Sequence, residues 1–139
     1  MSHALAQAGE RTGINFNSDR LVHNTMKSHR LVRLGGEQGK QDDIIEAIFH
    51  AYFEECANIA DPTVLVDIAK KAGVDCTKEY LEGSEGKAEV LSDYEQCASV
   101  HGVSGVPFYV LSREGNRGKI KLSGAQPSDA FVEAFEALS

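Results

Sequence analysis

The feature that most limits the fold of this chain is a glycine-rich loop that leads through a proline into an apolar segment. Residues 101–111 of the sequence read HGVSGVPFYVL. Proline has no N–H, so it is tolerated at the first residue of a strand but not inside a central one. Gly102 and Gly105 allow the chain to turn sharply just before it. The sequence therefore predicts a loop up to Pro107 and a strand that begins at Phe108.

Length and charge limit the class of protein. With 139 residues, of which 42% are hydrophobic, the chain can build one core, so residues 1–139 are expected to form a single domain. The net charge of −7 argues against nucleic acid or an anionic membrane surface as a partner. The N-terminus carries no basic segment followed by an apolar core, and no apolar run approaches the length of a membrane span. We therefore expect neither a nucleic-acid nor a membrane partner.

The cysteines indicate the redox environment. The sequence has three, Cys56, Cys76 and Cys97, and none of them belongs to a Cys-x-x-Cys pair. An odd number cannot pair completely within the chain, and the spacing fits no zinc site. The pattern favours a reducing, cytoplasmic setting and predicts no metal.

Apolar periodicity predicts a mainly helical region before the loop. The first dozen residues are expected to be loosely ordered, followed by a short extended piece at 13–17. Helices are then predicted from Asn24-Thr25 to about Leu34, where Gly35-Gly36 stops the helix, from Asp42 to Cys56, from Pro62 to Gly73, over 75–81, and from Ser84 to His101. Asp61-Pro62 is typical of an N-cap followed by proline at the first helical position.

After the loop the periodicity changes. Residues 108–111 and 119–123 read as two strands joined by a turn, which predicts an antiparallel hairpin. A final helix follows, with Phe131, Phe135 and Leu138 spaced along one face. The fold class is therefore α+β with a thin sheet.

Several of these motifs together resemble one family. The segment Gly105-Val106-Pro107-Phe108, followed by residues 122–127, is similar to the C-terminal half of the DsbA-like, thioredoxin-fold thiol–disulfide oxidoreductases. Upstream, residues 24–31, 51–53 and 61–65 resemble the helical insertion of the FrnE-like subgroup. The resemblance covers about residues 13–138 and keeps the order of the motifs.

The resemblance implies an incomplete, truncated thioredoxin-like fold of the DsbA type. Residues 13–101 would form mainly the helical insertion, and residues 102–139 the β-β-α unit. Family members begin with a strand, a helix bearing Cys-x-x-Cys and a second strand, which this sequence lacks. In the family one of those strands pairs beside the strand that Pro107 opens. Its absence would leave an apolar sheet edge, so we expect a dimer or larger homo-oligomer.

The resemblance also implies a substrate-binding site in the loop. In the family the corresponding proline is cis and faces the redox cysteines, and the residue before it hydrogen-bonds an extended substrate through its backbone. Ser104, Val106 and Pro107 are therefore the predicted substrate-binding residues, and the partner is an extended peptide or a protein thiol.

Cys97 is the candidate catalytic residue. It lies one turn before His101, and such an i, i+4 pair can lower the pKa of a thiol, which a reactive thiolate requires. The alternative is that the two residues are unrelated neighbours on one flank of a helix. Cys56 continues the apolar stripe of its helix and is expected in the core, and Cys76 has no further support for a role.

Three functions are consistent with the sequence. By resemblance the chain is a thiol–disulfide oxidoreductase domain, with little or no dithiol activity because Cys-x-x-Cys is absent. Alternatively, it is a non-enzymatic peptide-binding or self-assembling module that uses the Val-Pro loop and the sheet edge. The third function is glutathione binding, as in the kappa-class transferases and related isomerases. That family has a Ser-Asp pair where this chain has Ala125-Gln126, which weakens the third function, and no other cofactor is expected.

Overall fold

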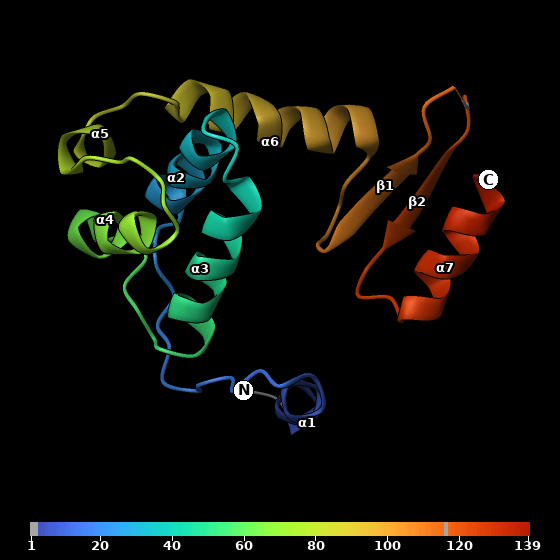
Figure 1. Cartoon of the computed structure of the whole chain (residues 1–139), viewed down its shortest axis with the longest axis horizontal. Helices are drawn as coiled ribbons and strands as arrows, with labels where there is room; N and C mark the ends of the chain where they lie inside the picture. The colour runs from blue at the N-terminus through green and yellow to red at the C-terminus, as the bar shows by residue number, and fades with distance from the viewer. Residues whose placement is uncertain (1–2, 116) are drawn as a thin grey trace. The chain divides into compact units, whose positions relative to one another are not determined.

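The structure, a computed structural model, describes residues 3–115 and 117–139. The chain forms two compact units, the first ending at Ser92 and the second beginning at Asp93 (Figure 1). The prediction of a single domain stays a prediction. No helix within the described ranges has the length and apolar character that a membrane crossing requires.

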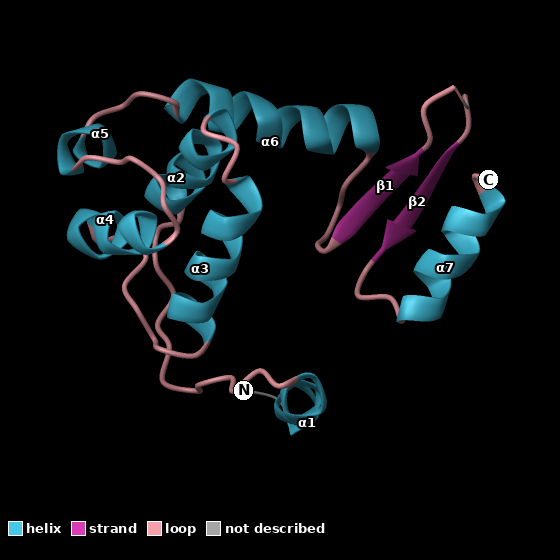
Figure 2. Cartoon of the chain, viewed as in Figure 1, coloured by secondary structure: helices cyan, strands magenta, loops and turns pink. Residues whose placement is uncertain are grey.

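The first unit is helical (Figure 2). It contains α1 (His3–Thr12), α2 (Met26–Glu37), α3 (Gln41–Phe53), α4 (Pro62–Lys71), α5 (Lys78–Glu82) and the beginning of α6 (Lys87–His101). Its core lies among α2, α3, α4 and α5, and the side chains of Leu31, Ile44, Leu65 and Leu81 are fully buried there. Asp61 caps α4 as predicted, because its side chain accepts a hydrogen bond from the Thr63 N–H at 2.8 Å.

Two expectations at the ends of helices are wrong. The first dozen residues are not loosely ordered, because residues 3–12 form α1, whose alanines and Leu5 are strong helix formers. The helix predicted to run to Cys56 ends at Phe53. Cys56 lies beyond that end, with a positive φ of 56° and a half-buried side chain. Periodicity alone could not show that the chain leaves the helix before Cys56.

Helix α2 also differs from its prediction, because it continues through Gly35 and Gly36 to Glu37. Gly35 is buried where α2 meets α3. A Cβ atom at Gly35 would lie 2.7 Å from Cγ2 of Ile44 and 3.3 Å from the carbonyl oxygen of Lys40. The glycine therefore allows close packing of two helices, and it does not end the first of them.

We predict opposite effects for alanine at the two glycines. Gly35→Ala should cost about 1–3 kcal/mol of stability, because overpacking against Ile44 outweighs the gain in helix propensity. At Gly36 the atom nearest to an added Cβ would be Oε1, at the flexible end of the Gln41 side chain, at 2.9 Å. Gly36→Ala should therefore be neutral or stabilising by up to about 1 kcal/mol. Urea denaturation of both variants checks the prediction, and equal effects would contradict it.

A buried arginine joins α2 to the segment after α5. Arg30 is 2% exposed, and its guanidinium donates to backbone carbonyls. Nε donates to Glu85 at 2.5 Å, and Nη1 donates to Leu81 at 3.1 Å and to Gly83 at 3.0 Å. Nη2 donates to the carbonyl of Tyr80, whose ring centroid lies 5.0 Å from the guanidinium carbon. The Arg30 guanidinium supplies hydrogen-bond donors and a positive charge to the carbonyls at the C-terminal end of α5, which lack partners within the helix.

A histidine network holds the segment after α1 against the end of α3. Nδ1 of His50 lies 2.9 Å from Oε1 of Glu54, and its Nε2 lies 3.3 Å from Oε1 of Glu55. The second oxygen of Glu54 accepts a hydrogen bond from the Asn15 N–H at 3.0 Å. The hydrogen bond to Glu54 raises the pKa of His50, and the same bond lowers the pKa of Glu54.

This network predicts a window of pH in which the contact is favourable. Because the pKa of His50 is raised, its contribution to the free energy of unfolding is fully present below the ordinary histidine pKa of about 6.5. This contribution is lost as pH rises through the raised pKa of His50. The contribution of Glu54 is lost at the other end, as pH falls through its lowered pKa. An NMR titration should show that Glu54→Gln lowers the pKa of His50, whereas Glu46→Gln, on the same helix, leaves it unchanged. An unchanged pKa in both variants would contradict the prediction.

The second unit consists of the end of α6, a hairpin and a helix. Strands β1 (Phe108–Ser112) and β2 (Lys119–Ser123) pair antiparallel, with Phe108 opposite Ser123 and Ser112 opposite Lys119. Helix α7 (Ser128–Ala137) packs against the hairpin, where the rings of Tyr109 and Phe131 meet edge to face at 4.9 Å. The predicted α+β class and the predicted β-β-α ending are confirmed.

Candidate functional site: the Val-Pro loop

The loop that leads into β1 is held at both ends. Gly102 has a positive φ of 68° after the end of α6. The N–H of Val103 then donates to the carbonyl of Cys97 at 3.2 Å. At the other end the carbonyl of Pro107 accepts a hydrogen bond from the N–H of Gly124 at 2.8 Å, which extends the β1–β2 ladder by one pair. The loop is therefore a defined connection between a helix and a sheet.

Between these two ends the loop is open to solvent. Ser104, Gly105 and Pro107 are exposed, and Val106 keeps 88% of its surface. The peptide bond between Val106 and Pro107 is cis. The structure thus brings Ser104, Val106 and Pro107 together on one exposed turn directly before a strand. This turn can offer both side chains and backbone groups to a ligand.

The backbone of Cys97 contacts this loop. Its carbonyl accepts from Val103, while its side chain is exposed on α6. The side chain of His101 lies outside the described part of the chain, so the predicted pair with Cys97 stays a prediction.

The other two cysteines are less accessible. Burial raises the pKa of Cys76, which reduces the fraction of reactive thiolate. Its sulfur also lies 3.6 Å from the carbonyl oxygen of Thr77. Cys56 is half-buried. Accessibility therefore favours Cys97 as the thiol that a substrate would meet.

Gln126, one of the two residues that stand where the kappa-class transferases have a Ser-Asp pair, has a structural role. The side-chain amide of Gln126 donates to the carbonyl of Ser123 at 2.7 Å and so braces the connection between β2 and α7. Arg113 braces the same unit at the C-terminus, because its Nη1 donates to the carbonyl of Ser139 at 2.7 Å. Neither contact was evident from the sequence, since both join residues through backbone carbonyls that have no sequence signal.

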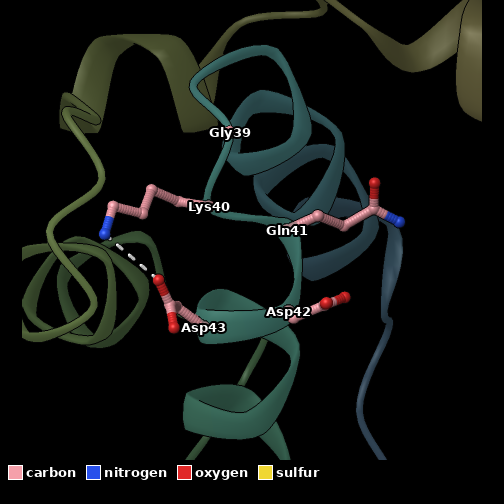
Figure 3. A pocket seen from close by; sticks show the side chains of 5 residues that line it. All are labelled: Gly39, Lys40, Gln41, Asp42 and Asp43. Carbon is pink, nitrogen blue, oxygen red and sulfur yellow. Dashed lines mark ion pairs between the residues drawn. The ribbon is translucent and has the colours of Figure 1, made fainter.

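A shallow pocket in the first unit is a weaker candidate. It is lined by Gly39, Lys40, Gln41, Asp42 and Asp43, where the chain turns into α3 (Figure 3). Lys40 and Asp43 form an ion pair there, with 3.2 Å between Nζ and Oδ2. Acidic residues in the first turn of a helix are explained by the helix dipole. Across the described residues, no group of three or more metal-ligating side chains is placed to hold a metal ion.

Fold and site together define a domain in which a helical region precedes a thioredoxin-type β-β-α unit with a Val-Pro loop. A family model described as DSBA-like thioredoxin domain matches residues 1–136. The chain therefore belongs to the DSBA-like thioredoxin domain family.

A solved structure supports the same assignment. The chain is similar to a probable DsbA oxidoreductase from Streptomyces coelicolor, with 30% sequence identity and a TM-score of 0.79. The match covers 99% of this chain and 62% of the chain from Streptomyces, so this chain spans less than two thirds of the length of that protein. A comparison with curated proteins found no match.

Proposed function

We propose that this chain takes part in thiol–disulfide exchange as a domain that binds an extended polypeptide at the Val-Pro loop. The observation that carries the proposal is the exposed turn at Ser104, Val106 and Pro107, which is anchored by hydrogen bonds at both ends. An anchored backbone next to a strand can hydrogen-bond an extended chain at small entropic cost. We further propose the FrnE-like subgroup and a cytoplasmic setting, on the sequence features given above.

Exchange by this chain alone would depend on Cys97. Its thiolate would attack one sulfur of a substrate disulfide, forming a mixed disulfide and releasing the other sulfur as a thiolate. No second cysteine follows within a Cys-x-x-Cys motif, so an external thiol such as dithiothreitol would have to release the substrate. The missing second cysteine supports slow exchange at most.

The first test is reduction of insulin by dithiothreitol, with and without the protein. We expect the protein and its Cys97→Ala variant to give the same rate, close to that of dithiothreitol alone. Turnover that disappears in Cys97→Ala would contradict the proposed weak activity and would identify this thiol as catalytic. Cys76→Ala is the matched control, because its thiol is partly buried and has a raised pKa.

The second test is binding of a model peptide, followed by NMR. We expect chemical-shift changes at Ser104, Val106 and the first residues of β1. The control is the same peptide N-methylated at alternate residues, which keeps the side chains and removes backbone donors. Equal changes with both peptides, or changes confined to the first unit, would overturn the assignment of the loop as the binding site.

A further inference from the structure

One peptide group joins the segment before α7 to the Val-Pro loop. It consists of the carbonyl of Ser123 and the N–H of Gly124, which the planar peptide bond points in opposite directions. Its N–H donates to the carbonyl of Pro107 at 2.8 Å, and its carbonyl accepts from the side-chain amide of Gln126 at 2.7 Å. The side chain of Gln126 and the backbone of Pro107 are therefore linked through a single rigid group.

The strand register explains why this peptide group has a partner on each side. Pro107 lies opposite Gly124 in a hydrogen-bonded pair, and such pairs alternate with non-hydrogen-bonded pairs along an antiparallel ladder. Ser123, opposite Phe108, therefore directs its carbonyl away from β1. A carbonyl oxygen can only accept, so the atom of Gln126 that faces it is the amide nitrogen.

Gly124 makes the orientation of this peptide group dependent on its hydrogen bonds. Its φ is +80°, and glycine adopts positive and negative φ about equally well. The peptide group before Gly124 can therefore rotate at small cost once a hydrogen bond is lost, which would turn the N–H away from Pro107. Pro107 has no N–H, so its carbonyl is the one backbone group through which it can join the ladder.

We propose that Gln126 is a positioning residue for the Val-Pro loop. By holding the Ser123–Gly124 peptide group, its amide keeps the carbonyl of Pro107, and with it the exposed turn at Val106, in the orientation that receives an extended polypeptide. Hydrogen bonds in a chain polarise one another, so the bond at Gln126 also strengthens the bond at Pro107. The inference rests on the proposed function, because it gives Gln126 a part in that binding site without contact with the ligand.

Amide hydrogen exchange of the free protein tests the positioning, whether or not a peptide binds. We expect Gln126→Ala to speed exchange at Gly124 roughly fivefold, the factor that one net hydrogen bond is worth. The N–H groups of Tyr109 and Leu111, which face β2 inside the ladder, should keep their rates. Equal acceleration at all three would mean that Gln126 stabilises the whole hairpin and would overturn the inference, as would unchanged exchange at Gly124.

An NMR titration with a short, uncharged peptide with capped ends tests the consequence for binding. Gln126→Ala should raise the Kd roughly fivefold, because fewer molecules hold the loop in the binding orientation. Gln126→Glu has the same shape but donates no hydrogen bond as a carboxylate, so it should have the same effect. Gln126→Lys keeps N–H donors and should recover part of the affinity. The matched control is Gln96→Ala, the same change at an exposed residue of α6 in the same unit, which should leave the Kd unchanged.

The two measurements separate this inference from the proposed function. A parent protein that binds no peptide at the Val-Pro loop would contradict the proposed function, and the exchange rates would then decide whether Gln126 positions Pro107. Equal affinities of the parent and Gln126→Ala, or equal losses in Gln126→Glu and Gln126→Lys, would contradict the role of Gln126 and leave the binding site in place. Circular dichroism verifies that each variant folds.

Discussion

Replacing Arg30 with methionine should lower the free energy of unfolding by about 3 kcal/mol. Methionine has a similar length but donates no hydrogen bond. The carbonyls of Tyr80, Leu81, Gly83 and Glu85 would lose the donor that now serves all four. Those that stay shielded from water carry the full cost of an unmade hydrogen bond. Urea denaturation followed by circular dichroism measures the loss.

Two further variants separate this role from charge alone. Arg30→Lys keeps the positive charge but replaces a planar group with five donors by a compact ammonium, so it should recover only part of the loss. Arg33→Met is the matched control on the same helix. Nε of Arg33 lies 3.5 Å from Glu37 on the surface, and such pairs are worth about 1 kcal/mol at most. If Arg33→Met costs as much as Arg30→Met, the anchoring role of Arg30 is wrong.

Leu65→Ala should destabilise the protein by about 2–5 kcal/mol. The Leu65 side chain is fully buried in the core of the first unit, with Leu31 and Ile44 in the same cluster. Truncation removes apolar surface from that core and leaves a cavity that helices α2, α3 and α4 fill only partly. The midpoint of urea denaturation should fall, while the slope of the transition stays the same.

The control for this truncation is Leu21→Ala. Leu21 is 69% exposed, so the same chemical change removes little buried surface and should stay within about 0.5 kcal/mol of the parent. A small loss at Leu65, similar to that at Leu21, would show that the helical unit does not have the core described above. A large loss at both positions would show that Leu21 is covered in solution.

The Val-Pro loop and the hairpin were predicted from sequence more accurately than any other part. Glycine, proline and alternating apolar residues act over a few neighbours, so their signals need no partner elsewhere in the chain. Of the candidate site, the sequence indicated Ser104, Val106, Pro107 and Cys97. It could not show that Val106 is almost fully exposed or that Pro107 is held by Gly124.

The sequence by itself determined the order of the helices from Met26 onward, the cap at Asp61, the strands after Pro107 and the final helix, because each is specified by residues close together in the chain. Tertiary structure alone decided that Gly35 lies inside a helix, that Cys56 lies outside one, and that Arg30 rather than Arg33 is the buried cation. Two of these outcomes depend on atoms supplied by another segment: the Ile44 methyl group lies against Gly35, and the carbonyls of residues 80–85 surround Arg30. Local propensity carries no information about such a contact.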